Sequence, residues 1–383
     1  MLQLDKLYST HLKKQFNYPQ YLILLLLINL LQNLKTVRLE ELARRFPYPI
    51  KLRSRLKKLQ RFLSMQQLNP KTLWFPIIKS WIQQEWNLKE TIYVVIDRSQ
   101  WRAINLLMVS FIYNRRAIPI YFCLLPKKGN SNLAQQKQVL EPALNLLKDY
   151  RVVVLGDREF CGVDLAKWLS EEEQVYLSLR LKKNEYVELD EQIWFQLRDL
   201  GLSPGMSLYY QGIKVTKTQG TTGFNLAAKW KRNYRSRCSK EPWFILTNLT
   251  SLSAATVAYS KRMGIEEMFR DFKGGGYTLE NTQVENDRLL SLILLITIAY
   301  SFSTFSGQNI KQKGIAKYVA RPTEPKRFYQ QHSNFSIGLN GINWLDSLTF
   351  FYDRMQELIS FFPHKNDYYR QGLRAASLIQ SAL

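Results

Sequence analysis

Two short apolar runs, each ending on an aspartate, constrain the fold of this chain more than any other feature. TIYVVID ends at Asp97 and RVVVLGD ends at Asp157. Both runs are continuous and rich in β-branched residues, which predicts two buried strands. A charge at the end of a buried strand costs free energy unless a partner compensates it, and ligand sites are often built at the carboxyl ends of such strands. Position alone supports a turn-forming role and a site role for the aspartates about equally.

The segments around these runs predict a mixed sheet. INLLMVSFIYN (104–114) and AIPIYFCLLP (117–126) are two further strands that flank a tight turn at Asn114-Arg115-Arg116. Helices are predicted over 133–150, interrupted at Pro142, and over 163–172, and a fifth strand over 175–181. A meander followed by strands reached through helical crossovers gives an α/β fold with helices on the faces of a mixed sheet. This order of elements is similar to that of the ribonuclease-H-like fold.

The remaining segments complete the predicted domains. Residues 1–85 are a helical N-terminal region, in which two short helices on either side of Phe46-Pro47-Tyr48-Pro49 resemble a helix-turn-helix. An ordinary helical bundle with a charged face is an equally good interpretation of that region. The ribonuclease-H-like core is predicted over 86–183 and 251–305, split by a separate β-rich insertion over 184–250. Residues 306–383 form a C-terminal helical tail.

The charge balance indicates a polyanionic partner. The chain has 383 residues, with 54 Lys+Arg against 31 Asp+Glu, and therefore a formal charge of +23. The alternative is that the charge serves solubility alone, but the basic residues cluster with aromatic residues at 51–62 and 227–237, as nucleic-acid binding requires. We therefore expect this basic surface to bind nucleic acid.

Cysteine, histidine and hydropathy exclude several classes of protein. The three cysteines form no CxxC and the three histidines no HExxH, which argues against a disulfide scaffold and against zinc sites. The apolar runs at 21–31 and 289–302 are shorter than the ~20 residues that cross a bilayer, so both predict buried helices. We expect a cytoplasmic protein that does not associate with membranes.

A third carboxylate lies in YSKRMGIEEMFRDFK (259–273). At about 100° per residue, Tyr259, Arg262, Glu266 and Lys273 fall near 0°, 300°, 340° and 320°, within one stripe about 60° wide. Ile265, Met268 and Phe272 fall on the opposite side. On helix geometry alone, a surface ion-pair ladder between Arg262 and Glu266 is the more common explanation.

These residues resemble a known family. The spacing Y-x2-R-x3-E-x6-K at Tyr259, Arg262, Glu266 and Lys273 is similar to the motif of the insertion-sequence-four family of DDE transposases. WFILTNL upstream, the Asp97 strand and GDREF around Asp157 also look like that family. The resemblance covers roughly residues 36–305.

The resemblance implies roles for individual residues. Asp97, Asp157 and Glu266 would hold two Mg²⁺ or Mn²⁺ ions as the catalytic triad, while Tyr259, Arg262 and Lys273 would contact phosphates. A tryptophan of the insertion would stack a flipped base, with Trp230 the first choice over Trp194 and Trp243. Glu159, two residues after Asp157, is either an acid that supports the catalytic residues without binding the metal or a plain surface residue, and the second interpretation is preferred. Gly264 interrupts the helix of the motif.

The function implied is cut-and-paste transposition. The protein would bind the terminal inverted repeats of its element and the target DNA, act as a homodimer in the synaptic complex, and cleave and join strands. Two alternatives stay open: a ribonuclease-H-like nuclease or resolvase that never joins strands, and a catalytically silent DNA-binding protein derived from a transposase.

Overall fold

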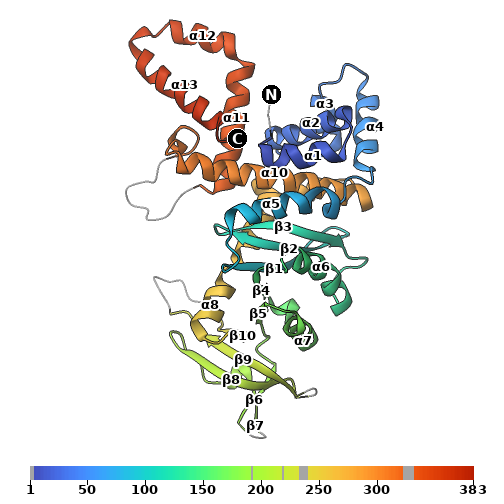
Figure 1. The fold of residues 1–383 in the computed structure, drawn as a ribbon, viewed down its shortest axis with the longest axis vertical. Coiled ribbons are helices and arrows are strands. Elements are labelled where there is room, and N and C mark those ends of the chain that lie inside the picture. The colour runs from blue at the N-terminus through green and yellow to red at the C-terminus, as the bar shows by residue number, and fades with distance from the viewer. Residues whose placement is uncertain (1–3, 191–192, 218–219, 233–239, 322–331) are drawn as a thin grey trace. The chain divides into compact units, whose positions relative to one another are not determined.

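The computed structural model describes residues 4–190, 193–217, 220–232, 240–321 and 332–383 (Figure 1). The chain divides into two compact units. The sheet unit comprises Ile82–Arg270, and the helical unit combines Met1–Trp81 with Asp271–Leu383.

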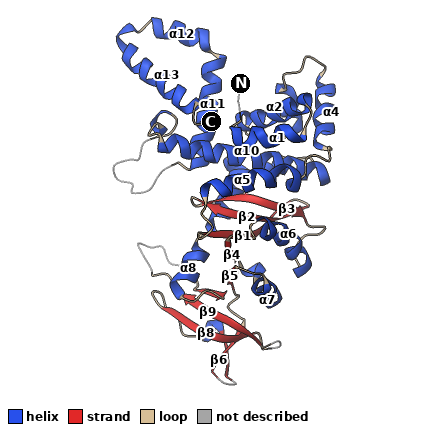
Figure 2. Ribbon diagram, viewed as in Figure 1, coloured by secondary structure: helices blue, strands red, loops and turns tan. Residues whose placement is uncertain are grey.

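A single mixed sheet organises the sheet unit (Figure 2). Its strands follow the order β3-β2-β1-β4-β5-β10-β9-β8-β6-β7. β1 pairs antiparallel with β2 and parallel with β4, and β4 pairs parallel with β5. The first five positions confirm the predicted meander followed by crossover strands, and hence the α/β, ribonuclease-H-like fold. The strands are β1 (Thr91–Trp101), β2 (Ile104–Tyr113), β3 (Arg116–Leu124), β4 (Arg151–Gly156), β5 (Val175–Arg180), β6 (Tyr186–Asp190), β7 (Ile193–Gln196), β8 (Ser207–Val215), β9 (Thr221–Lys229) and β10 (Trp243–Thr247).

Local turn chemistry explains the predicted β2–β3 hairpin. Asn114 and Arg115 both adopt positive φ, 45° and 69°, as a two-residue turn with the twist of a hairpin requires. The prediction that the first strand ends at Asp97 is wrong, because β1 continues to Trp101. Its antiparallel pairing with β2 extends as far as Trp101 opposite Ile104, beyond the last residue that pairs with β4.

The β-rich stretch after β5 is not a separate sheet. β10 pairs antiparallel with β5, and β9 continues the sheet beyond β10. The strands after β5 therefore belong to the same sheet as β1 to β5, and the boundaries of the predicted insertion at 184–250 stay a prediction. This pairing satisfies the backbone groups that β5 would otherwise expose as an edge strand.

Four helices pack on this sheet: α6 (Leu133–Leu146), α7 (Val163–Glu171), α8 (Leu252–Ser260) and α9 (Met263–Arg270). α6 continues through Pro142, contrary to the predicted interruption, and buries Val139, Leu140, Ala143 and Leu144. α9 packs on β3 and β2, where Gly264 permits close approach: a Cβ there would lie 2.9 Å from Ile112 Cδ1 and 3.3 Å from the Ala117 nitrogen.

The helical unit is built around one long helix. α10 (Asn286–Gln312) buries most of its length, and the predicted buried helix at 289–302 is confirmed. By length and composition α10 could cross a membrane, yet 89% of its most apolar window is buried inside the protein, as in a core helix. The other helices of this unit are α1 (Lys6–Gln15), α2 (Tyr18–Leu34), α3 (Leu39–Arg45), α4 (Leu52–Leu63), η1 (Pro70–Trp74), most of α5 (Phe75–Glu85), η4 (Asp271–Gly275), η5 (Leu279–Asn281), η6 (Ala316–Tyr318), α11 (Asn334–Phe350), α12 (Tyr352–Ser360), η7 (Pro363–Lys365) and α13 (Asn366–Gln380).

The predicted pair of short helices around Phe46-Pro47-Tyr48-Pro49 is present as α3 and α4. Arg55 of α4 donates to the carbonyls of Arg44 and Phe46, at 3.4 and 3.2 Å, and so ties α4 to the end of α3.

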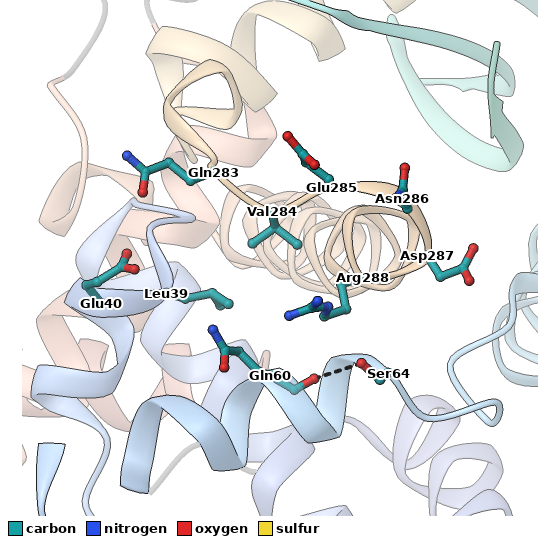
Figure 3. Close-up of a pocket in the computed structure, with 10 residues that line it drawn as sticks. All are labelled: Leu39, Glu40, Gln60, Ser64, Gln283, Val284, Glu285, Asn286, Asp287 and Arg288. Atoms are coloured by element: carbon teal, nitrogen blue, oxygen red, sulfur yellow. Dashed lines mark hydrogen bonds between the residues drawn. The ribbon is translucent and has the colours of Figure 1, made fainter. Parts of the chain in front are cut away.

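A polar pocket of about 440 Å³ lies between this helix pair and the start of α10. Figure 3 shows Gln60 and Arg288 on its wall, with the Ser64 hydroxyl bonded to the Gln60 carbonyl at 3.1 Å. None of the predicted site residues lines it.

Candidate active site

The strand register brings Asp97 and Asp157 together. Ile96 of β1 lies opposite Gly156 of β4 in a parallel pair, so the two aspartates are the next residue on each strand. Asp97 also lies opposite Met108 of β2, on the same face as Ser110, whose hydroxyl contacts the sulfur of Met268 on α9. The register therefore directs Asp97 to the face of the sheet that α9 covers.

Backbone amides fix one oxygen of each aspartate. The Arg98 N–H donates to Asp97 Oδ1 at 2.7 Å, and the Glu159 N–H donates to Asp157 Oδ1 at 2.8 Å. Charge-assisted bonds of this kind are among the stronger ones in proteins. They leave the Oδ2 atom of each carboxylate available to other partners.

Arg262 joins Asp97 to Glu266. Its Nη1 lies 3.3 Å from Asp97 Oδ2, and its Nη2 donates to Glu266 Oε1. Arg262 and Asp97 are largely buried, with side chains 13% and 15% exposed, whereas Glu266 is 41% exposed. The structure thus brings Asp97, Arg262 and Glu266 into one cluster, with Asp157 beside Asp97.

The motif does not lie on one continuous helix, as the predicted stripe requires. α8 ends at Ser260 and α9 begins at Met263, because i,i+3 bonds such as Arg262 N–H to the Tyr259 carbonyl, 3.1 Å, tighten the backbone between them. The predicted core-facing positions Ile265, Met268 and Phe272 are all fully buried.

Lys273 lies beyond these helices, in the helical unit. Its backbone leaves the helical region, with ψ −112°, and its ammonium pairs with Glu280 at 2.8 Å. Its predicted phosphate contact stays a prediction.

The electrostatics of Asp97 reflect this crowding. The pKa of Asp97 is raised from 3.8 to about 7, chiefly by burial and also by the charges of Asp157 and Glu266, while the Arg98 amide and Arg262 oppose the shift. Three carboxylates that disfavour one another's charge are a donor set suited to a divalent cation, since oxygen ligands are those that Mg²⁺ and Mn²⁺ prefer. Across the described residues, no three His, Cys, Asp or Glu side chains already form a closed metal site, and here Arg262 lies between Asp97 and Glu266.

Tyr259 is buried rather than exposed to a ligand, at 3% of its surface. Burial raises its pKa, while Arg262 and Arg180 favour its ionised form. Its ring meets that of Trp243 edge-on at 4.9 Å, and Lys231 lies 4.4 Å from the Trp243 ring. Trp243 is the first residue of β10, and its side chain is partly exposed.

The other two candidate tryptophans lie elsewhere on the sheet. Trp230 follows the end of β9 and is partly exposed, and its N–H donates to the Met206 carbonyl at 2.9 Å. Trp194 lies on the edge strand β7. The part of the 227–237 cluster at 233–237 falls outside the described residues.

Arg98 and Arg180 escaped the sequence analysis, which assigned Glu159 to the surface. Glu159 is not a surface residue: its side chain is 13% exposed and pairs with Arg98 at 2.9 Å. Arg180 reaches the carboxylate of Glu241, which also pairs with Arg158. The available signal was the position of Arg98 directly after Asp97 and of Glu159 two residues after Asp157.

Part of this chain matches the model of a known protein family. Residues 112–302 match the model of the family described as the transposase DDE domain. The matched range contains Asp157, Arg262 and Glu266 and begins after Asp97. No curated protein matches the chain.

A solved structure is also similar. The cryo-EM structure of a piggyBac transposase synaptic complex with hairpin DNA matches at a TM-score of 0.45 and 13% identity, over 92% of this chain and 78% of that chain. A TM-score and identity this low carry no argument about the family, which rests on the domain match alone. The match of residues 112–302 to the transposase DDE domain supports this chain as a DDE transposase.

Proposed function

We propose that the protein is a cut-and-paste DNA transposase of the insertion-sequence-four type, with Asp97, Asp157 and Glu266 as its catalytic acids. The observation that carries the proposal is the cluster itself. The two aspartates directly follow Ile96 and Gly156, which lie opposite each other on two adjacent parallel strands, and an arginine links one aspartate to a glutamate. Residues that belong to different segments and meet in this way are rarely explained by local structure.

Each group has a proposed role. Asp97 and Asp157 would bind the divalent ions through their Oδ2 atoms, since their Oδ1 atoms are held by backbone amides, and Glu266 would complete the set. Such ions, when bound, activate the attacking water or 3′-hydroxyl and stabilise the leaving oxygen. Arg262 would move from Asp97 to the phosphate beside the scissile bond, where its planar guanidinium can bind two oxygens. Because Tyr259 is buried, it would orient Arg262 and would not stack its ring against DNA.

A basic helix face supports binding to double-stranded DNA. Arg53, Lys57 and Arg61 are exposed at four-residue spacing along α4, next to the exposed Lys51. Residues four apart lie on the same side of a helix. We propose that this face binds the terminal inverted repeats, in the manner of the second helix of a helix-turn-helix.

The base-stacking tryptophan is open to a direct comparison. Trp230 is the residue proposed from the sequence, and contact with Tyr259 supports Trp243 as well. Stacking is worth about 1–3 kcal/mol per base. The experiment places 2-aminopurine beside the cleavage site and measures its fluorescence with the Trp230→Ala and Trp243→Ala proteins. The tryptophan that stacks on the base is the one whose replacement abolishes the stacking signal.

A homodimer is the proposed state on DNA, and the C-terminal helices support it. A groove of about 420 Å³ between α11, α12 and α13 is lined by Trp344, Leu358, Phe362, Tyr368 and Leu373. Residues 344–383 hold four basic and four acidic residues, so all of the net charge of +23 lies elsewhere. Two copies of so basic a chain repel each other least when they meet through this segment, because it carries no net charge. Light scattering of wild type and Leu358→Ser, with and without DNA, tests its role.

The decisive experiment measures cleavage and joining on labelled duplex carrying the end of the element. Wild type is compared with Asp97→Ala, Asp157→Ala and Glu266→Gln in Mg²⁺ and in EDTA. Loss of both reactions in every variant, with DNA binding retained, supports the proposal. Cleavage without joining supports a ribonuclease-H-like nuclease instead, and binding without either reaction supports a silent DNA-binding protein.

A further inference from the structure

An ion pair outside the proposed acids bridges the two strands that carry the aspartates. Nε of Arg98 lies 2.9 Å from both carboxylate oxygens of Glu159. The side chains are only 16% and 13% exposed. The pair therefore connects β1 to the turn after β4, segments that are 61 residues apart.

The same two residues hold the aspartates through their backbones. The amide of Arg98 binds Oδ1 of Asp97, and the amide of Glu159 binds Oδ1 of Asp157. The chain of contacts is thus continuous: one aspartate, the amide and side chain of Arg98, the side chain and amide of Glu159, and the other aspartate. A change in the side-chain bridge would alter the separation of the two carboxylates.

Further hydrogen bonds anchor the bridge from outside. The amide and the hydroxyl of Ser131 both donate to Glu159 Oε1 at 3.1 Å. Nη1 of Arg98 donates to Asn105 Oδ1 at 3.1 Å, and Asn105 in turn donates to the carbonyls of Lys127 and Gly129, at 2.7 and 3.0 Å. Buried polar networks in which every member is bonded are rigid.

We propose that Arg98 and Glu159 are positioning residues that set the spacing of Asp97 and Asp157 for binding of divalent cations. The inference rests on the proposed function, because it assigns these residues to the same site. The two side chains carry opposite charges, so the pair as a whole adds no net charge to the site. Its effect on the site is therefore mainly on the geometry of the two aspartates. Partners that orient metal ligands in this way typically affect metal affinity or activity by 10- to 100-fold.

The test measures Mn²⁺ affinity of the full-length protein without DNA, by isothermal titration calorimetry, and then the Mn²⁺ dependence of strand cleavage. The variants are Glu159→Gln, Arg98→Gln and the double variant. Each single variant should raise the Kd for Mn²⁺ about 10- to 100-fold. The Kd of the double variant should not exceed that of the single variant with the higher Kd, because both substitutions break the same bridge. Saturating Mn²⁺ should restore most of the cleavage rate, which a damaged fold would not allow.

A matched control and a conservative variant separate positioning from folding. Glu188→Gln removes an equally buried carboxylate, 9% exposed, from its 2.9 Å pair with Lys214 and should leave Mn²⁺ affinity unchanged. Arg98→Lys keeps the charge but has no second nitrogen to bind Asn105 Oδ1 as well as Glu159, so it should fall between wild type and Arg98→Gln.

Single variants that bind Mn²⁺ within twofold of wild type would overturn the inference while leaving the proposed function intact. A wild-type protein that neither binds Mn²⁺ nor cuts DNA would overturn both.

Discussion

Arg262 donates to Oδ2 of Asp97 at 3.3 Å, the oxygen of that carboxylate that the backbone leaves open. In the proposed metal site, this is the position that an incoming cation would take. The guanidinium also compensates negative charge beside Asp97, whose pKa burial and the charges of Asp157 and Glu266 raise. The proposed function therefore requires Arg262 to stabilise the cluster without a cation and to leave it when a cation binds.

Replacing this arginine should separate cation binding from catalysis. In Arg262→Gln, Mn²⁺ should bind about tenfold more tightly without DNA, equivalent to about 1.4 kcal/mol, because a competing positive charge is gone. Cleavage should fall about 100-fold or more, because a phosphate ligand is lost. Calorimetry and cleavage rates measure the two effects. Arg116→Gln, which breaks a comparable pair with Glu267 at 3.1 Å, serves as the control. Weaker Mn²⁺ binding in Arg262→Gln would contradict the competition.

Asp97 should make the protein less stable as the pH rises. Its pKa in the folded state, about 7, lies above the ordinary 3.8, so the folded protein holds a proton that the unfolded chain releases. The stabilising contribution is complete below about pH 4 and is lost as the pH rises to 7. In EDTA, Asp97→Asn should therefore be more stable than wild type by about 1–3 kcal/mol at pH 8, or roughly 1–4 °C in Tm.

Thermal unfolding at pH 4, 6 and 8 checks this, with Asp199→Asn, at a side chain 60% exposed, as the control. The advantage of Asp97→Asn should grow between pH 4 and 7 and then level off. An advantage that is constant across this range would show that Asp97 is ionised throughout.

The sequence predicted those parts of the fold that depend on neighbouring residues. The apolar run before Asp97 and the turn at Asn114 and Arg115 are local patterns, and both strands and their hairpin are present. The pairing of β10 with β5 was not predicted, because Ile245 and Arg180 meet across 65 positions and nothing in either strand encodes that register. The insertion was accordingly expected to be separate.

The site shows the same division. Strand-end chemistry identified Asp97 and Asp157, whereas the pairing of Arg98 with Glu159 exists only once β1 and β4 are side by side. Helical periodicity predicted a stripe that a tightened turn at Arg262 divides. Burial of Tyr259 depends on packing against Trp243, a contact that its own segment does not reveal.

The crossing of α10 and α11 should tolerate no added methyl group. A Cβ at Gly307 would lie 1.8 Å from the Asn334 carbonyl oxygen, and one at Gly338 equally close to that of Ser303. Gly307→Ala should therefore destabilise the protein by at least about 1–3 kcal/mol, since backbone cannot move aside as a side chain can. Gly372→Ala, on α13 with no atom within 4 Å, is the matched control and should gain up to about 1 kcal/mol from helix propensity. Urea midpoints of the two variants measure the contrast, and equal midpoints would contradict the packing argument.

DNA affinity should depend on the exposed cations of α4 rather than on charge in general. Each phosphate contact contributes about −0.9 to the slope of log K against log salt. Replacing Arg53, Lys57 and Arg61 by Gln should therefore make the slope shallower by about 2.7 and weaken binding to all duplexes at low salt. The control removes three equally exposed cations, Lys365, Arg370 and Arg374, from the C-terminal segment that carries no net charge. It has the same change in total charge, so only a local contact distinguishes the two proteins. Fluorescence anisotropy between 50 and 200 mM salt measures both slopes. Equal slopes would mean that α4 attracts DNA only through the overall field of the protein and does not touch its backbone.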